Sequence, residues 1–172
     1  MVWMIIILLL ELLMSPIRFD NRLDLVDPID DWADKVHKIG LDTFDNEKDA
    51  DIFESQMRWE SAGYQEDVLY GKTVGGAGER GGPQYTPLIA KSRGIVPGNP
   101  QADFEDASKL MKTYLGKYNN DWTKALAAYN AGEPSVDTSM EKYGADWLKG
   151  IPASTRTGYL PSVLSRYYGR RD

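Results

Sequence analysis

The sequence predicts a mainly α-helical protein, and three stretches with helical spacing of apolar residues carry this prediction. In the longest stretch, residues 104–118, apolar residues recur three or four positions apart, as on one face of a helix. The second begins at Asn120 or Asp121, either of which can cap a helix, and ends at Gly132. The third, near 154–168, ends in paired tyrosines, and the chain shows no internal repeats or sustained heptads.

Two further helices are expected upstream of these. The first runs from residue 30 or 31 to 44, and we expect Gly40 to break it late. The second runs over 47–61, because Asn46 and Asp49 resemble a capping box just before it. The side chains expected to face the core from this second helix are Ala50, Phe53 and Met57.

Residues 62–102 are rich in glycine and proline and predict a loop. Within this segment we expect a short helix over 86–93 and, as an open alternative to plain loop, a small hairpin before Gly75. The glycines between 75 and 82 allow the backbone to approach a ligand closely. No Gly-Lys-Ser/Thr sequence follows them, so they do not form a phosphate-binding loop.

The amino-terminal residues 1–14, MVWMIIILLLELLM, are almost wholly apolar. They are shorter than the roughly 20 residues of a spanning helix, and no lysine or arginine precedes the apolar run as in a signal peptide. We interpret them as a helix that anchors the protein to an assembly or membrane; an uncleaved membrane tether and a poor signal sequence are the alternatives. Residues 15–30 predict an extended linker, and residues 31–172 form the domain.

Composition limits the chemistry available to this domain. With 172 residues the chain is long enough for one folded domain, and its net charge of -6 argues against nucleic-acid binding. The absence of cysteine excludes disulfides and thiolate zinc sites, and the single histidine, His37, cannot build a histidine metal cluster. We therefore expect no cofactor and no metal in the site, and chemistry that runs on carboxylates, hydroxyls and amides.

Glu60 is the candidate acid, because it is the next position on the apolar face of the 47–61 helix. Partial burial raises the pKa of a carboxyl group by desolvation and makes it a usable general acid near neutral pH. The glutamate that serves as general acid in lysozyme has a pKa of about 6 because it lies in an apolar pocket, which is the same physical principle. The alternative is a glutamate at a helix end that faces solvent.

Two other groups of residues suggest a binding surface. Gln84 offers an amide donor and acceptor beside the glycine-rich backbone, which suits sugar hydroxyls or an N-acetyl group. Tyr129 and Asn130 end an apolar helix and could line the same site. The alternatives are a flexible surface loop at Gln84, and a core tyrosine with a helix-capping asparagine.

Taken together, these residues resemble the catalytic domain of the lytic transglycosylases, the lysozyme-like SLT family, whose motifs run Glu-Ser, Gly-Leu-Met-Gln and Ala-Tyr-Asn-Ala-Gly in this order. The matching residues here are Glu60-Ser61, Gly81-Gly82-Pro83-Gln84 and Ala128-Tyr129-Asn130-Ala131-Gly132. A later group, Pro152 followed by Thr155 and Tyr159, is similar to the family's closing Pro-x-x-Thr-x-x-Tyr. The resemblance spans about residues 46–168.

The chain departs from the family pattern in four places. Gly82-Pro83 replaces Leu-Met, so the wall beside Gln84 loses apolar contacts. The stretch between Glu60 and Gln84 is several residues longer, Ser154 stands where a glutamate is common, and Pro161 enters the last helix. These departures affect the detail of the substrate subsites more than the reaction.

The resemblance implies a goose-type lysozyme-like helical domain that cleaves the β-1,4 bond between N-acetylmuramic acid and N-acetylglucosamine in peptidoglycan. Glu60 would act first as general acid and then as base toward the muramoyl C6 hydroxyl, which closes a 1,6-anhydro ring. Ser61 and Gln84 would position the sugar and the acid, and Tyr129 would hydrogen-bond the Glu60 carboxyl. Asn130 would border the cleft or secure its helix end, with Tyr159 a weaker candidate in the same pocket.

Two other functions stay open. A lysozyme-type hydrolase of the same fold needs a second carboxylate roughly 5–9.5 Å from the first, and Asp67 or Glu79 could supply it. The second open function is a structural or glycan-binding component with little catalytic activity. If Glu60 is not the general acid, Glu66 or Glu79 is the next candidate for this role.

The apolar amino terminus favours a bacteriophage virion protein, from the tail or ejected from the particle, that acts on the host cell wall. An envelope-tethered bacterial enzyme is the alternative.

Overall fold

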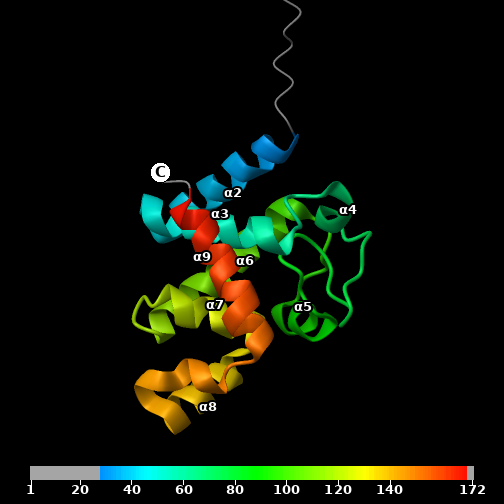
Figure 1. Ribbon diagram of the computed structural model, residues 1–172. Coiled ribbons are helices and arrows are strands. Elements are labelled where there is room, and N and C mark those ends of the chain that lie inside the picture. The colour runs from blue at the N-terminus through cyan, green and yellow to red at the C-terminus, as the bar shows by residue number, and fades with distance from the viewer. Residues whose placement is uncertain (1–27, 170–172) are drawn as a thin grey trace, which may run out of the picture.

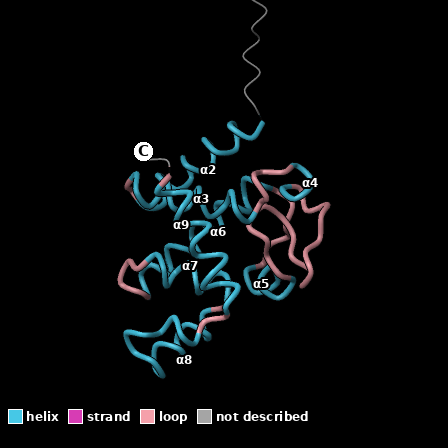
Figure 2. The backbone as a smooth tube through the Cα atoms, in the orientation of Figure 1, coloured by secondary structure: helices cyan, strands magenta, loops and turns pink. Residues whose placement is uncertain are grey.

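The computed structural model describes residues 28–169, which fold into packed helices with no strand among them (Figures 1 and 2). The prediction of a mainly α-helical protein is confirmed. Among these residues, none of the helices combines the length and the apolar character of a membrane-spanning segment. The elements in chain order are α2 (Pro28–Phe44), α3 (Glu47–Glu60), α4 (Glu66–Leu69), α5 (Pro87–Arg93), α6 (Pro100–Lys117), α7 (Trp122–Ala131), α8 (Glu133–Tyr143), η1 (Gly144–Gly150), η2 (Ser154–Tyr159) and α9 (Leu160–Tyr168).

Two details of the amino-terminal helices differ from the prediction. Helix α2 begins at Pro28, inside the predicted linker 15–30, because the first turn of a helix needs no N–H donor from proline. Gly40 does not break α2, which continues to Phe44. A Cβ atom on Gly40 would lie 2.9 Å from the Ala50 Cα, so the glycine lets α2 and α3 pack closely. The apolar segment 1–14 lies outside the described residues.

Helices α3, α6 and α7 build the core around the stripes that the sequence predicts. The buried members include Ala50, Phe53 and Met57 on α3, Phe104, Ala107, Met111 and Leu115 on α6, and Trp122, Ala125 and Leu126 on α7. The predicted caps also form: Asn46 accepts the Asp49 N–H at 2.9 Å, and Asp121 accepts the Lys124 N–H at 3.1 Å. This core fixes the position of Glu60 at the last residue of α3.

Residues 61–99 form the irregular side of the molecule, in which only the short helices α4 and α5 interrupt loops and turns, and the longest loop joins these two helices (Figure 2). The hairpin expected before Gly75 is absent from this segment. The described residues contain instead an isolated antiparallel bridge between Arg80 and Tyr85, which closes the turn from Gly81 to Gln84. The predicted helix over 86–93 is present as α5, capped by Thr86.

Two aspartates of α6 fasten this irregular segment to the core. Asp103 accepts the Gly98 N–H at 2.8 Å. Asp106 accepts the Tyr85 hydroxyl at 2.9 Å and is paired with the Arg93 guanidinium of α5. Side-chain bonds to one long helix therefore hold a segment in which the backbone forms a single isolated bridge.

Loop and core approach each other very closely at Gly82. A Cβ atom at this position would lie 2.5 Å from the Phe104 ring, and Phe104 is fully buried. The backbone of Gly82 therefore packs flat against the ring, and the leucine of the SLT pattern would not fit here without moving Phe104. The sequence indicated a loss of apolar contacts at this wall; the structure shows instead that Gly82 and Pro83 are buried.

Gly82→Ala is expected to lower the free energy of unfolding by about 1–3 kcal/mol, the usual cost of overpacking a core. Urea denaturation of the two proteins measures the difference. Gly76→Ala is the matched control, because nothing lies within 4 Å of a Cβ atom there. Equal stability of the two variants would show that the Phe104 ring moves aside freely.

The carboxyl-terminal third contains elements that the sequence did not predict. Helix α8 follows α7 directly after Gly132, and it buries few side chains, among them Val136 and Ser139. The expected helix over 154–168 consists of two parts: η2 is a π-helix, and α9 follows with Pro161 in its first turn. Helix α9 packs against α3 (Figure 1), and Tyr159 at the end of η2 interacts with Glu60 at the end of α3.

Candidate active site

A cleft lies between the end of α3, the Gly81–Gln84 turn and the end of α7. One part, of about 300 Å³, is lined by Trp59, Glu60, Glu79, Gln84, Thr86, Tyr129 and Asn130. An adjoining part of about 430 Å³ shares four of these residues and extends along α5, α6 and the start of α8. The shared residues are Gln84, Thr86, Tyr129 and Asn130. The two parts together form an elongated groove with Glu60 at one end.

Glu60 is the chemically distinctive residue of this groove. Burial of its carboxyl group raises the pKa from 4.5 to about 7, and the nearby Glu79 charge adds to this increase. Its Oε1 atom is fully buried and has no hydrogen-bond partner of standard geometry. A carboxyl group with a pKa near 7 can donate a proton and take one up at neutral pH, as a general acid and base must. The solvent-facing alternative for Glu60 is therefore wrong.

Tyr159 is the tyrosine whose hydroxyl acts on this carboxyl group. Its interaction with Glu60 lowers the carboxyl pKa against the larger effect of burial, although the contact is looser than a standard hydrogen bond. Tyr159 is buried and ends the π-helix, in which the Leu160 N–H bonds to the Thr155 carbonyl five residues back. The wider turn accommodates one more residue between Thr155 and Tyr159 than the family pattern has.

Tyr129 has a different role from the one expected. Its hydroxyl donates to the Pro83 carbonyl at 2.6 Å, not to Glu60 as predicted. Tyr129 thereby ties the end of α7 to the turn that carries Gln84, while its side chain lines the groove. The prediction failed because sequence places both tyrosines near the acid and does not show which hydroxyl reaches it.

Tyr159→Phe is expected to raise the Glu60 pKa further, because the hydroxyl that favours the carboxylate is removed. The alkaline limb of the activity profile should then move to higher pH. Tyr129→Phe should leave that limb in place, because its hydroxyl is bonded to Pro83. Initial rates measured from about pH 5 to 9 test both variants. If the alkaline limb of Tyr159→Phe stays where it is in the wild type, Tyr159 is not the tyrosine that acts on Glu60.

Asn130 and Gln84 both line the groove, and each is also held by the chain. The Asn130 Oδ1 atom accepts the Thr155 hydroxyl at 2.7 Å, which links α7 to η2. The Gln84 Nε2 atom donates to the Gly81 carbonyl at 2.8 Å, inside its own turn. Gln84 has a φ of 55°, an uncommon value for a residue other than glycine. The turn therefore holds this side chain at the groove, where its amide oxygen is available to accept a bond.

Ser61 lies away from the groove. Its side chain is fully buried; the hydroxyl donates to the Met57 carbonyl at 2.7 Å and accepts the Tyr64 N–H at 3.0 Å. These two bonds close the end of α3 behind Glu60. Ser61 thus supports the acid through the backbone, and the geometry does not favour the predicted contact with sugar.

Glu79, Trp59 and Thr86 complete the groove. The sequence singled out Glu79 as a possible second carboxylate and as a replacement candidate for the acid. The structure brings it beside Glu60, where the Ala77 N–H donates to its Oε2 at 2.8 Å. Asp67, the other candidate, is exposed and bonded to Lys72. Trp59 was missed, although it directly precedes Glu60; its side chain is 42% exposed at the rim.

Trp59→Ala is expected to raise KM for glycan strands by about two- to tenfold with a smaller effect on kcat. An aromatic contact is worth about 0.5–1.5 kcal/mol, and about 1.4 kcal/mol corresponds to tenfold in affinity. Steady-state rates on soluble glycan strands test this. Tyr70→Ala removes an aromatic ring that is exposed to a similar degree but lies outside the groove, and it should leave KM unchanged.

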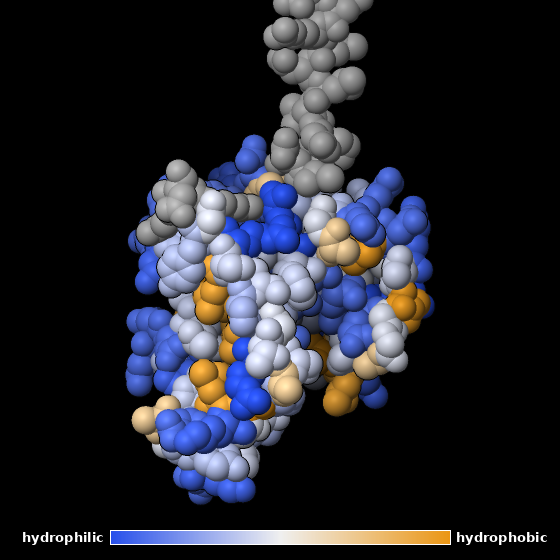
Figure 3. Space-filling model, viewed as in Figure 1, coloured by the Kyte–Doolittle hydropathy of each residue, from blue (hydrophilic) through white to orange (hydrophobic). Residues whose placement is uncertain are grey.

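Size alone does not select this groove, because a cavity of about 440 Å³ also lies between α8 and η1. Its lining contains no carboxylate. On the face drawn in Figure 3, apolar residues form small separate patches among polar ones. The groove at Glu60 is distinguished by its chemistry, since it combines a buried acid, a second acid, amides and aromatic rings.

Comparison with known families gives a match to part of the chain. Residues 97–147 match the family model described as the transglycosylase SLT domain. The matched part contains α6, α7 and α8 with Tyr129 and Asn130, whereas Glu60, Gln84 and Tyr159 lie outside it. The helical fold is consistent with the lysozyme-like fold of that family. The match supports the lytic transglycosylase family, a family of glycan-cleaving enzymes that act on peptidoglycan.

Proposed function

We propose that this protein is a peptidoglycan lytic transglycosylase that cleaves the bond between N-acetylmuramic acid and N-acetylglucosamine and leaves a 1,6-anhydromuramoyl end. The observation that carries the proposal is the Glu60 carboxyl group, with its pKa raised to about 7 at the end of a groove. The match to the SLT domain over residues 97–147 supports the choice of substrate class.

The proposed reaction uses one carboxyl group twice. Protonated Glu60 donates its proton to the glycosidic oxygen as the C1–O bond breaks, and N-acetylglucosamine leaves as an alcohol. The Glu60 carboxylate then takes the proton of the muramoyl C6 hydroxyl, whose oxygen forms the new bond to C1. Glu60 ends protonated, as it began, and no water is consumed. The C6 hydroxyl is held within the substrate, which gives this step the advantage of an intramolecular reaction.

The groove supports a polymeric substrate. It continues from Glu60 past Gln84, Tyr129 and Asn130 into the larger part along α5 and α6. The amides and aromatic rings along this path are suited to sugar hydroxyls, N-acetyl groups and the apolar faces of sugar rings. A glycan strand can thus extend from the acid along the molecule.

A lysozyme-type hydrolase is the second candidate, and Glu79 favours it. Glu79 lines the groove next to Glu60, and its charge raises the Glu60 pKa. In such an enzyme Glu79 would activate a water molecule or attack C1 itself, while Glu60 protonates the leaving oxygen. Glu79 would then be required for turnover, whereas the lyase reaction needs Glu60 alone.

Mass spectrometry of muropeptides released from purified sacculi distinguishes the two candidates. The lyase gives anhydromuropeptides, and Glu79→Gln still gives the same products. Reducing ends that carry one added water, lost in Glu79→Gln, would identify a hydrolase. Release of neither product, with sacculi still bound, would identify the third possibility, a glycan-binding component without activity.

The setting in which the protein acts stays a proposal. We propose a bacteriophage particle, with attachment through residues 1–14, on the support of their apolar composition. An envelope-tethered bacterial enzyme is the alternative. Mass spectrometry of purified particles and of host membranes shows which of the two contains the chain, and its absence from particles would reject the virion setting.

A further inference from the structure

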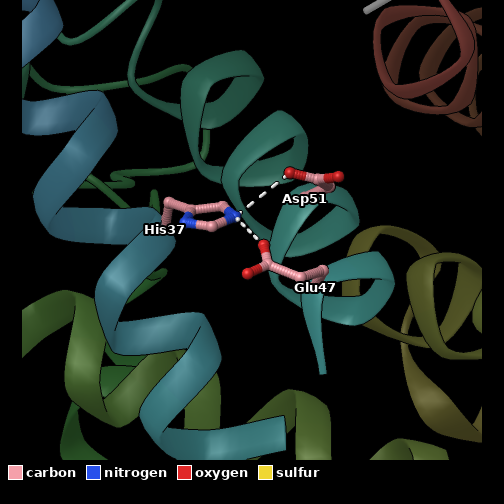
Figure 4. A group of neighbouring side chains, drawn as sticks. All are labelled: His37, Glu47 and Asp51. Atoms are coloured by element: carbon pink, nitrogen blue, oxygen red, sulfur yellow. Dashed lines mark ion pairs between the residues drawn. The ribbon is translucent and has the colours of Figure 1, made fainter. Parts of the chain in front are cut away.

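A second cluster of titratable side chains lies outside the groove, on the α2–α3 pair. Figure 4 shows that the His37 imidazole of α2 points toward two carboxylates of α3. The His37 Nε2 atom lies 3.3 Å from Glu47 Oε2 and 3.1 Å from Asp51 Oδ1. The three donor atoms all lie within 4.8 Å of one another.

This cluster is separate from the candidate active site. Glu47 is the first residue of α3 and Glu60 is the last, so the two are about 20 Å apart along the helix. None of the three side chains lines the groove. Any ligand of this cluster is therefore independent of the proposed reaction.

The spacing of the donors suits a small divalent cation. Zinc binds histidine nitrogen and carboxylate oxygen at about 2.0–2.2 Å, usually in a tetrahedron. Ligands of a tetrahedron with such bonds are about 3.4 Å apart, close to the two distances from His37. Glu47 and Asp51 are four residues apart on one helix face, which places both carboxylates on the same side.

The charges of the cluster also favour binding of a cation. The two carboxylates place two negative charges beside one nitrogen atom. A protonated Nε2 has a single hydrogen to share between them. A metal ion can bond to all three donors at once. His37 and Asp51 are half-buried, with 28% and 30% of their side chains exposed, while the Glu47 side chain is 76% exposed.

We propose that His37, Glu47 and Asp51 bind a first-row divalent cation such as Zn²⁺ and thereby join α2 to α3. The nitrogen ligand favours zinc over magnesium, which takes oxygen ligands. The single histidine of the chain excludes a histidine cluster, but it does not exclude a mixed site whose carboxylates come from a neighbouring helix.

The sequence makes this proposal sharply testable, because the chain has one histidine and no cysteine. The imidazole-proton NMR signals of a tag-free, full-length protein report on His37 alone. Titration with ZnCl₂ should shift these signals with saturation at one equivalent, and calorimetry should give the same stoichiometry. The thermal unfolding midpoint should rise with zinc concentration, as it does for any ligand that binds the folded state.

His37→Gln and Asp51→Asn should each weaken zinc binding by more than about tenfold, the loss that follows even from removing an outer partner of a metal ligand. Asp42→Asn removes an exposed carboxylate of α2 that pairs with Lys38, and it should bind zinc as the wild type does. Circular dichroism in EDTA checks that the variants fold. Unshifted His37 signals, several weak equivalents, or equal binding by Asp51→Asn would each show that the cluster is an ion pair only.

Discussion

Glu60→Gln is expected to lower the rate of peptidoglycan cleavage by about 10²–10⁴-fold, the usual contribution of general acid and base catalysis. Glutamine keeps the shape of the side chain but neither donates nor accepts the catalytic proton. The loss should fall on kcat, because the groove residues that bind the strand are unchanged. Release of muropeptides from sacculi, followed over time, measures this effect.

Glu66→Gln is the matched control for this experiment. Glu66 was the other acid that the sequence left open, and the structure places it exposed at the start of α4, outside the groove. This variant should retain the activity of the wild type. A Glu60→Gln protein with near-normal rates would show that the acid lies elsewhere, with Glu79 the next residue to replace.

The same Glu60→Gln substitution is expected to stabilise the fold increasingly as pH rises from about 4 to 8. The pKa of Glu60 is raised from 4.5 to about 7 by burial in the folded protein. Below pH 4.5 the group is protonated in both the folded and the unfolded state, so it carries no penalty there. Between pH 4.5 and 7 the unfolded chain loses the proton first, and the wild-type free energy of unfolding falls.

Each pKa unit corresponds to about 1.4 kcal/mol, so the shift sets an upper limit of about 3 kcal/mol. Part of the residue is exposed, and we expect the stability difference between glutamine variant and wild type to grow by about 2 kcal/mol over this pH range. Urea denaturation at several pH values measures it. Glu141→Gln, at an exposed site on α8, should show no such trend; a flat difference for Glu60→Gln would mean that the carboxyl is not desolvated.

The sequence determined the helices whose apolar stripes build the core. Apolar spacing predicted that α3, α6 and α7 are helices, and the caps Asn46 and Asp121 indicated where two of them begin. Both signals depend on residues close together in the sequence, namely the capping bonds and the helical period of about 3.6 residues. The sequence also indicated Glu60 as the candidate acid, because this residue continues the apolar face of its helix, but it left a solvent-facing side chain open as the alternative. Helix α8 escaped prediction because it buries few apolar side chains after Gly132.

Only the tertiary structure decided which groups surround Glu60. The turn that carries Gln84 is positioned by the contact of Gly82 with Phe104 and by Asp103 and Asp106, all distant in sequence. The π-helix brings the Tyr159 hydroxyl to Glu60, and the Pro83 carbonyl holds Tyr129 away from that role. Such assignments depend on packing between distant segments, which no local pattern encodes, whereas the helices that carry these residues follow from their own sequences.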